Sequence, residues 1–327
     1  MEKLEEVDLC FPQLNTSCRK TVRPQFEAVS ICSLQFIVAF LTVALNLLVI
    51  ISISHFRQLH TNTNILVLSL AVTDFLVGLL QMPIEIILDQ GCWLLGDFIC
   101  AANFSLSYLL VSVSVGNLVL ISVDRYVAIC DPMFYYTKVT LSRVQMCICL
   151  CWLFSAVHSS WILRDFVKRQ QQNSHDFCYG DCVVAITYAQ VAVDFVVTFL
   201  GPFLIITLLY IRVFVVAVSQ ARAMRSQIEA VTLSETEKPK KSEIKAARIL
   251  GVVVFVFLLC STPYYFFSIA SEVNTIAGTS VSLWLLYCNS CLNPLIYTYF
   301  YPWFRKAIQH IFTLEILKPG SCEANIL

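Results

Sequence analysis

Seven long stretches of the chain carry almost no charge, and they constrain the fold more than any other feature. Five contain no Asp, Glu, Lys or Arg, and two contain isolated acids: Asp74 and Glu85 in one, Asp194 in the other. A bilayer requires about 20 apolar residues for each crossing helix. The stretches are Ala28–Ser54, Ile65–Leu88, Phe98–Val123, Val144–Leu163, Val183–Ile211, Ile249–Ser271 and Val273–Phe304. The sequence therefore predicts an all-α bundle of seven transmembrane helices.

The composition agrees with a membrane protein and disfavours the other classes. Hydrophobic residues make up 58% of the chain and charged residues 13%, with a mean hydropathy of +0.74, whereas a soluble domain carries about 25% charged residues. A transporter or channel of repeated halves would show an internal repeat, and the sequence contains none. We find no nucleophile–base set and no metal-ligand spacing, so we do not expect an enzyme.

An odd number of spans puts the two termini on opposite sides of the membrane. Most Lys and Arg residues fall in segments that are cytoplasmic if the N-terminus is outside, as the positive-inside rule favours. We predict an outer tail over 1–28, a seven-helix domain over 29–301 and a cytoplasmic segment over 302–327, in a multi-pass protein of the plasma membrane. Asn15 begins a glycosylation sequon in the outer tail.

The last segment has the pattern of a short amphipathic helix. Pro302 opens it, and Phe304, Ile308 and Phe312 recur at helical spacing beside Arg305 and Lys306. Such a helix lies on a membrane surface with its basic side chains toward the headgroups. We expect it to follow the seventh span along the inner leaflet.

Short motifs at the ends of the spans resemble those of rhodopsin-like G-protein-coupled receptors. Asp124-Arg125-Tyr126 ends the third span, and Asn293-Pro294-Leu-Ile-Tyr297 lies near the end of the seventh. The sequence from Asn289 to Phe304 is similar to the fingerprint of trace amine-associated receptors. The resemblance covers nearly the whole chain.

This resemblance implies disulfides, a signalling switch and a partner. It pairs Cys100 with Cys182, and Cys18 with Cys178, although Cys10 remains an alternative partner for Cys178 and neither has to pair. The implied switch residues are Asp124, Arg125, Tyr126, Glu243, Asn293, Pro294 and Tyr297, with Arg125 held by Asp124 or by Glu243. The implied partner is a heterotrimeric G protein of the Gs class, which raises cyclic AMP, and the implied physiology is olfaction.

Counting from the outer ends of the spans at 1.5 Å per residue puts several polar side chains at one depth. These candidate ligand-binding residues are Ser107, Asp194, Tyr264, Tyr265, Trp284 and Tyr287. They predict an outward-opening cavity between helices.

Ser107 occupies the position where many amine receptors carry an Asp, so we expect Asp194 to hold a protonated amine instead. An acid at membrane depth usually faces a cavity or a partner, and the sequence offers no Lys or Arg there. Tyr264 and Tyr265 would add cation–π attraction. In the alternative interpretation, Asp194 has a structural role and is hydrogen-bonded to Tyr188 or Tyr265. The protein is then a receptor for a non-amine ligand or a receptor without a known ligand.

Two further predictions concern acids at other depths. Glu85, near the outer end of the second span, is either the site of a second ligand charge or a solvated acid in the vestibule. Deeper in the bundle, Asp74, Ser114, Asn289, Ser290 and Asn293 resemble the sodium pocket of the receptor family; a water-filled polar network is the alternative. No other cofactor is expected. Ser261 stands where the family usually has Trp.

Overall fold

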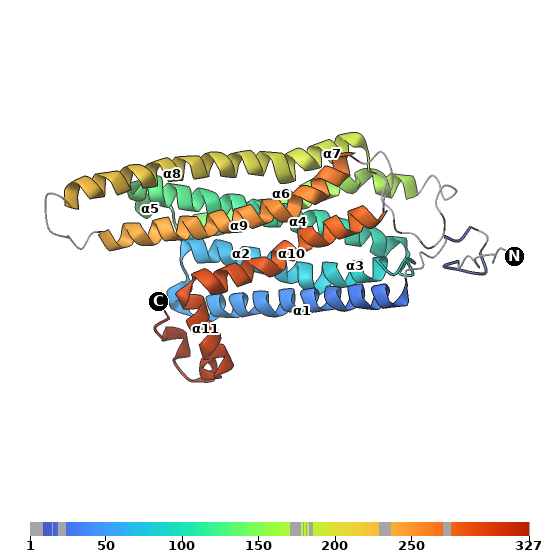
Figure 1. The fold of residues 1–327 in the computed structure, drawn as a ribbon, viewed down its shortest axis with the longest axis horizontal. Coiled ribbons are helices and arrows are strands. Elements are labelled where there is room, and N and C mark those ends of the chain that lie inside the picture. Colours follow the sequence, from blue (N-terminus) through green and yellow to red (C-terminus); the bar gives the residue numbers. More distant parts are fainter. Residues whose placement is uncertain are drawn as a thin grey trace.

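The computed structural model describes residues 9–14, 16–18, 24–170, 178, 180, 182, 186–228, 237–270 and 276–326. Long helices run side by side in this part of the chain (Figure 1). They are α1 (Gln25–His55); α2 (Asn62–Leu76), the π turn η2 (Val77–Gln81) and α3 (Met82–Leu88); α4 (Gly96–Cys130); α6 (Leu141–Gln170); α7 (Tyr188–Phe195), the π turn η3 (Val196–Leu200) and α8 (Gly201–Ile228); α9 (Glu237–Ala270); and α10 (Ile276–Phe300). Shorter helices are η1 (Arg57–Leu59), α5 (Pro132–Lys138), α11 (Pro302–Phe312), η4 (Glu315–Leu317) and η5 (Ser321–Glu323).

Six helices of the described residues are long and apolar enough to cross a membrane: α1, α2 with α3, α4, α6, α7 with α8, and the 251–269 part of α9. α10 has 25 residues, which gives about 37 Å, and this exceeds the apolar thickness of a bilayer. It packs against α9 and α1. Phe40, Leu153 and Phe255 point away from the protein interior, as side chains in contact with lipid do. The predicted bundle of seven helices is confirmed.

α4 lies at the centre of the bundle, where it contacts α2, α6, α8 and α9. One close approach depends on a glycine, because a Cβ added to Gly116 would overlap the sulfur of Cys151 on α6. Small residues allow helices in membranes to pack at short range. The tight α4–α6 contact fixes the helix that carries Ser107 and Arg125.

The two ends of the described chain lie at opposite ends of the bundle (Figure 1). α1 begins at Gln25, about one turn before the predicted end of the outer tail. α11 follows α10 at the other end, and it is amphipathic as predicted: Phe304 and Ala307 are buried, whereas Arg305 and Lys306 are exposed.

Beyond α11 the chain turns back toward the α1–α2 connection, which the sequence did not predict. Ile326 is fully buried in the same apolar cluster as Phe56 and Phe304. Its amide donates to Oε1 of Gln58 at 3.3 Å, and Glu323 lies 3.4 Å from Arg57. The last described residues are therefore packed against the α1–α2 connection.

Candidate functional site

Asp194 lies on α7, which forms the first part of the fifth membrane helix. The helix starts with a capping box between Thr187 and Gln190. The Gln190 amide also donates to the carbonyl of Ile162 on α6 at 2.8 Å, which fixes the rotation of α7. As a result the Asp194 side chain points between helices and keeps 13% of its surface exposed.

The Asp194 carboxylate has few protein partners. The Thr198 hydroxyl lies 3.3 Å from Oδ1, but it is closer to the Asp194 carbonyl and to the Tyr265 hydroxyl, at 2.6 Å each. Tyr188 is 78% exposed. The direct hydrogen bond from Tyr188 or Tyr265 that a structural role would require is not observed. Oδ2 accepts no hydrogen bond from the described residues.

His158 on α6 is a neighbour of Asp194 that the sequence argument missed. Its Nε2 is 3.8 Å from Oδ1 of Asp194, and its ring stacks on Phe154 at an interplanar angle of 8°. Among the described residues, neither ring nitrogen of His158 has a hydrogen-bond partner. Lys and Arg are not the only possible counter-charges to Asp194, because His158 is a titratable ring in a span without other charges.

Aromatic side chains from α4 and α9 lie close to Asp194. The Tyr264 and Tyr265 rings meet edge to face at 5.2 Å between centroids, and both hydroxyls interact electrostatically with Asp194. Tyr108, another residue that the sequence argument missed, hydrogen-bonds Tyr264 from α4. It directly follows Ser107, so one turn of α4 presents two polar side chains.

Ser107 and Tyr287 belong to a second group of polar side chains. Their hydroxyls are 2.8 Å apart, and Tyr287 interacts with Glu85 on α3. Oε1 of Glu85 accepts from the amides of Gln81 at 2.9 Å and Asn103 at 3.3 Å. Glu85 is only 9% exposed. The alternative of a solvated vestibule acid is therefore wrong.

Trp284 does not join either group but binds Asp89, an acid that was not predicted. The indole donates to Oδ2 of Asp89 at 3.1 Å, Gln35 donates to the same oxygen at 2.6 Å, and Ser280 donates to Oδ1 at 2.6 Å. These bonds connect α1 and α10 to the end of α3. Asp89 is thus fully paired with neutral donors and holds three helices together.

Three disulfides join segments at the end of the bundle where α1 begins. The two implied by the resemblance are present, Cys100–Cys182 and Cys18–Cys178. A third, Cys10–Cys92, was not predicted. The alternative that Cys10 binds Cys178 is therefore wrong. With the Cys10 amide bonded to the Cys18 carbonyl at 3.0 Å, the N-terminal segment is held at two points.

Comparison with known proteins decides the family. Residues 45–297 match the family described as 7 transmembrane receptor (rhodopsin family). The chain is 34% identical to trace amine-associated receptor 13c of Danio rerio, over 99% of this chain and 98% of that protein. It is 37% identical to trace amine-associated receptor 7b of Rattus norvegicus, over 98% of this chain and 92% of that protein. It is 36% identical to trace amine-associated receptor 9 of Rattus norvegicus, over 98% of this chain and 98% of that protein. The chain belongs to the trace amine-associated receptors of the rhodopsin family.

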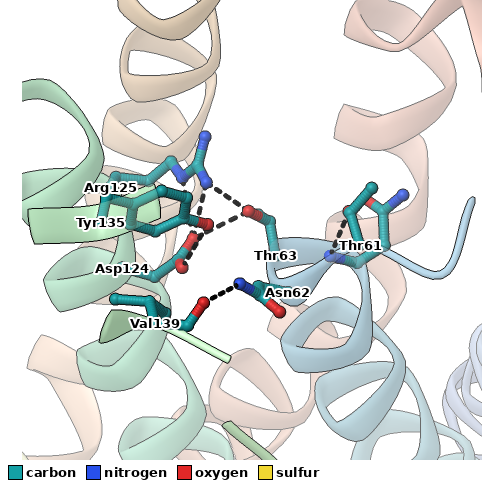
Figure 2. A network of polar contacts seen from close by, with 8 residues as sticks. Thr61, Asn62, Thr63, Asp124, Arg125, Tyr135 and Val139 are labelled. Carbon is teal, nitrogen blue, oxygen red and sulfur yellow. Dashed lines mark hydrogen bonds and ion pairs between the residues drawn. The ribbon is translucent and has the colours of Figure 1, made fainter. Parts of the chain in front are cut away.

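One end of this receptor's helix bundle, where α4 meets the start of α2, contains a compact network around Asp124 (Figure 2). Asp124 accepts from Nη2 of Arg125 at 2.6 Å, from Thr63 at 2.8 Å and from Tyr135 at 3.0 Å. Arg125 also contacts Thr63 directly. Burial raises the pKa of Tyr135 above its ordinary value, so the phenol remains a donor. The predicted Arg125–Asp124 pair is observed.

The other predicted switch residues lie in several places. Tyr126 packs beside Ile129 and Val213, and Tyr297 is buried in the main apolar cluster. Pro294 lies inside α10. The Glu243 side chain and the predicted glycosylation site Asn15 lie outside the described residues, so the alternative Arg125–Glu243 pair stays a prediction.

The deeper polar layer of the receptor is rich in unpaired oxygens. Asn293 donates to Oδ2 of Asp74 at 2.8 Å, but Oδ1 of Asp74 and the side-chain oxygens of Asn289 and Asn293 have no partner among the described residues. Ser290 also contacts Asp74, and Ser114 is buried. Carboxylate and amide oxygens are the ligands that a hard cation prefers. The residues therefore fit a sodium ion, which stays a prediction.

Proposed function

We propose that this receptor senses small protonated amines outside the cell and that Asp194 binds the ammonium group. The single observation that carries the proposal is the state of the Asp194 carboxylate. It lies between helices, it has one free oxygen, and within the described residues it pairs with no Lys or Arg. A buried carboxylate without a counter-charge is costly, and a ligand cation removes that cost.

The surrounding rings support this assignment. The faces of Tyr and Phe rings attract a cation, and Tyr264, Tyr265 and Phe199 form a continuous aromatic group near Asp194. The names of the related receptors also point to amines. In the proposed complex the ammonium binds Oδ2 of Asp194 and the rest of the ligand lies against these rings.

His158 is compatible with the proposal because of its geometry. At 3.8 Å, Nε2 of His158 is too far from Oδ1 of Asp194 for a good hydrogen bond. A neutral His158 leaves the negative charge of Asp194 available to the ligand. A charged His158 would compete with the amine.

An amine panel on expressing cells tests the assignment. Asp194→Ala is expected to weaken the response to active amines by about thirtyfold or more, since a lost partner in a buried charge pair costs about 2–5 kcal/mol. The matched control is Asp97→Asn, which removes an exposed acid at the start of α4. Responses are normalised to surface expression.

Equal responses from the wild type and Asp194→Ala would reject Asp194 as the amine site. Activation only by uncharged compounds would favour the alternative, a receptor for a non-amine ligand.

The proposal extends to orientation and signalling. We place the N-terminus outside and the C-terminus in the cytoplasm, in the plasma membrane, with a Gs-class protein as the partner and cyclic AMP as the output. The Lys and Arg distribution supports the orientation. Antibody access to an N-terminal tag on intact cells tests it, and cyclic-AMP accumulation compared with calcium release tests the G-protein class.

A further inference from the structure

His158 and Asp194 face each other from neighbouring helices without forming a good hydrogen bond. Nε2 of His158 lies 3.8 Å from Oδ1 of Asp194, whereas a nitrogen–oxygen hydrogen bond is about 2.7–3.2 Å long. Both nitrogens of the ring are buried, and neither has a hydrogen-bond partner among the described residues. A buried polar group without a partner raises the free energy of the folded protein. The pair is therefore incomplete in this structure.

The backbones that carry the two side chains are held in place by other bonds. Ser159, next to His158 on α6, donates to the carbonyl of Ser105 on α4 at 2.7 Å. Gln190, one turn before Asp194 on α7, donates to a backbone carbonyl of α6 at 2.8 Å. The gap between the two side chains can therefore close by rotation of the side chains, without movement of the helices.

Asp194 is the charged group that His158 faces. Around the pair, α4 contributes Tyr108, and α9 contributes Tyr264 and Tyr265. All three phenols interact electrostatically with Asp194. A phenol is uncharged near neutral pH, so none of them supplies a positive charge to the carboxylate.

The other contacts of α6 bring no second acid to the His158 ring. From α2, the neutral Ser69 hydroxyl accepts a hydrogen bond from α6. On α6 itself, Cys151 lies two turns before His158, and the guanidinium of Arg164 lies over a Trp ring at 5.0 Å from its centroid. Within the part of the chain that the structure describes, the one acid close to His158 is Asp194.

A proton on the ring would complete the pair. Imidazole is the side chain that changes its charge between about pH 5 and pH 8. In the charged ring both nitrogens are donors, and a charge-assisted bond to a carboxylate is about 2.7–2.9 Å long. Protonated His158 is thus a positive partner for Asp194, whereas the neutral ring leaves the carboxylate without one.

We propose that His158 is a proton-operated switch on the amine site, and that a proton antagonises the amine by pairing His158 with Asp194. The charged ring binds Oδ1, which it already faces, and the ligand ammonium binds Oδ2 of the same carboxylate. Two positive charges on one negative group repel each other, so the charged ring and the ammonium compete. This inference rests on the proposed role of Asp194.

The direction of the pH dependence follows from linkage between the two ligands of Asp194. If protonation of His158 weakens amine binding, a bound amine weakens protonation of His158 by the same factor. Amine potency is therefore highest above the pH range in which His158 titrates, and it falls as the pH decreases through that range. The ligand stays charged throughout, because alkylammonium groups have pKa values of about 10.

The test is a series of concentration–response curves on the full-length receptor in cells, at extracellular pH values from about 7.5 to about 5.5. The probes are n-alkylamines that activate the wild type at neutral pH, and responses are normalised to direct stimulation of adenylyl cyclase at each pH. The wild type is expected to lose about tenfold in potency and to keep its maximal response, because a proton that excludes the ligand lowers apparent affinity by mass action.

Two variants assign the effect to the ring. His158→Gln retains hydrogen-bonding groups but cannot take up a proton in this range, so its potency should be the same at each pH. The matched control is His60→Gln, which removes an exposed histidine at the α1–α2 connection and should keep the wild-type shift. If His158→Gln does not reach the cell surface, His158→Phe decides, because it retains a ring to stack on Phe154 and has no nitrogen.

The outcomes separate this inference from the proposed function. Amine responses that need Asp194 but change in potency by less than about twofold over the pH series overturn the switch and leave the amine site intact. A shift that survives in His158→Gln or His158→Phe assigns the proton to another group, such as Asp194 itself, and also overturns the switch. A fall in the maximal response without a change in potency excludes competition. Amine responses that are absent or independent of Asp194 overturn both proposals.

Discussion

Removing the Tyr135 hydroxyl should raise the activity of the receptor in the absence of ligand. Asp124 receives donors from Arg125, Thr63 and Tyr135 (Figure 2). A hydrogen bond to a charged group contributes about 1.5–3 kcal/mol. Tyr135 is partly exposed, so we take the lower value. If Asp124 must release Arg125 before a G protein can bind, 1.5 kcal/mol changes that equilibrium about tenfold.

The assay is basal nucleotide exchange on a G protein, measured in membranes and divided by the amount of receptor. Tyr135→Phe is expected to increase the basal rate by up to about tenfold. Tyr136→Phe is the control, because Tyr136 is the next residue, touches the Tyr135 ring at 6.0 Å between centroids and is 80% exposed. Equal basal rates in the two variants would refute the view that the Tyr135–Asp124 bond stabilises the resting receptor.

Three other predictions address the outer segments, the helix packing and the deep polar layer. Cys10→Ser and Cys92→Ser, singly or together, should cause the same loss of thermal stability in purified receptor, about 2–5 kcal/mol; a larger loss in the double variant would contradict the Cys10–Cys92 bond. Gly116→Val should reduce the folded yield strongly, because its side chain would enter the space of the Cys151 sulfur, and yields equal to wild type would show that α4 and α6 can separate. Asp74→Asn should abolish any effect of sodium on agonist affinity, and a sodium effect that persists, with potassium as the control salt, would place the ion elsewhere.

The sequence predicted the helices well because lipid imposes a simple rule. A backbone in a membrane must satisfy its own hydrogen bonds, so each charge-free stretch had to be helical. The motifs likewise placed Asp124, Arg125 and Asn293. The failures concern contacts between distant segments. The hydrophobic sequence around His158 does not indicate which side of α6 faces Asp194. The orientation of α6 depends on its packing against α4.

Other failures have related physical causes. The six cysteines of these segments allow many pairings, so the participation of Cys92 could be recognised only from the arrangement of the loops. Ile326 lies in a short segment without periodicity, and its burial depends on the apolar surface around Phe56 and Phe304. Glu85 was assigned to solvent in one alternative because its depth was estimated on a regular helix, without Gln81 and Asn103 as neighbours.

The π turns set which way Asp194 and Glu85 face. Asp194 lies on the outer side of η3, and Glu85 on the outer side of η2. A π turn accommodates one extra residue, and a residue of a regular helix corresponds to a rotation of about 100°. Deleting one residue from either π turn would therefore leave the other half of that helix unchanged. It would rotate the acidic side chain by about 100° around the helix axis. In evolution, a change in the length of η3 would thus alter the proposed ligand site without any substitution at Asp194 itself.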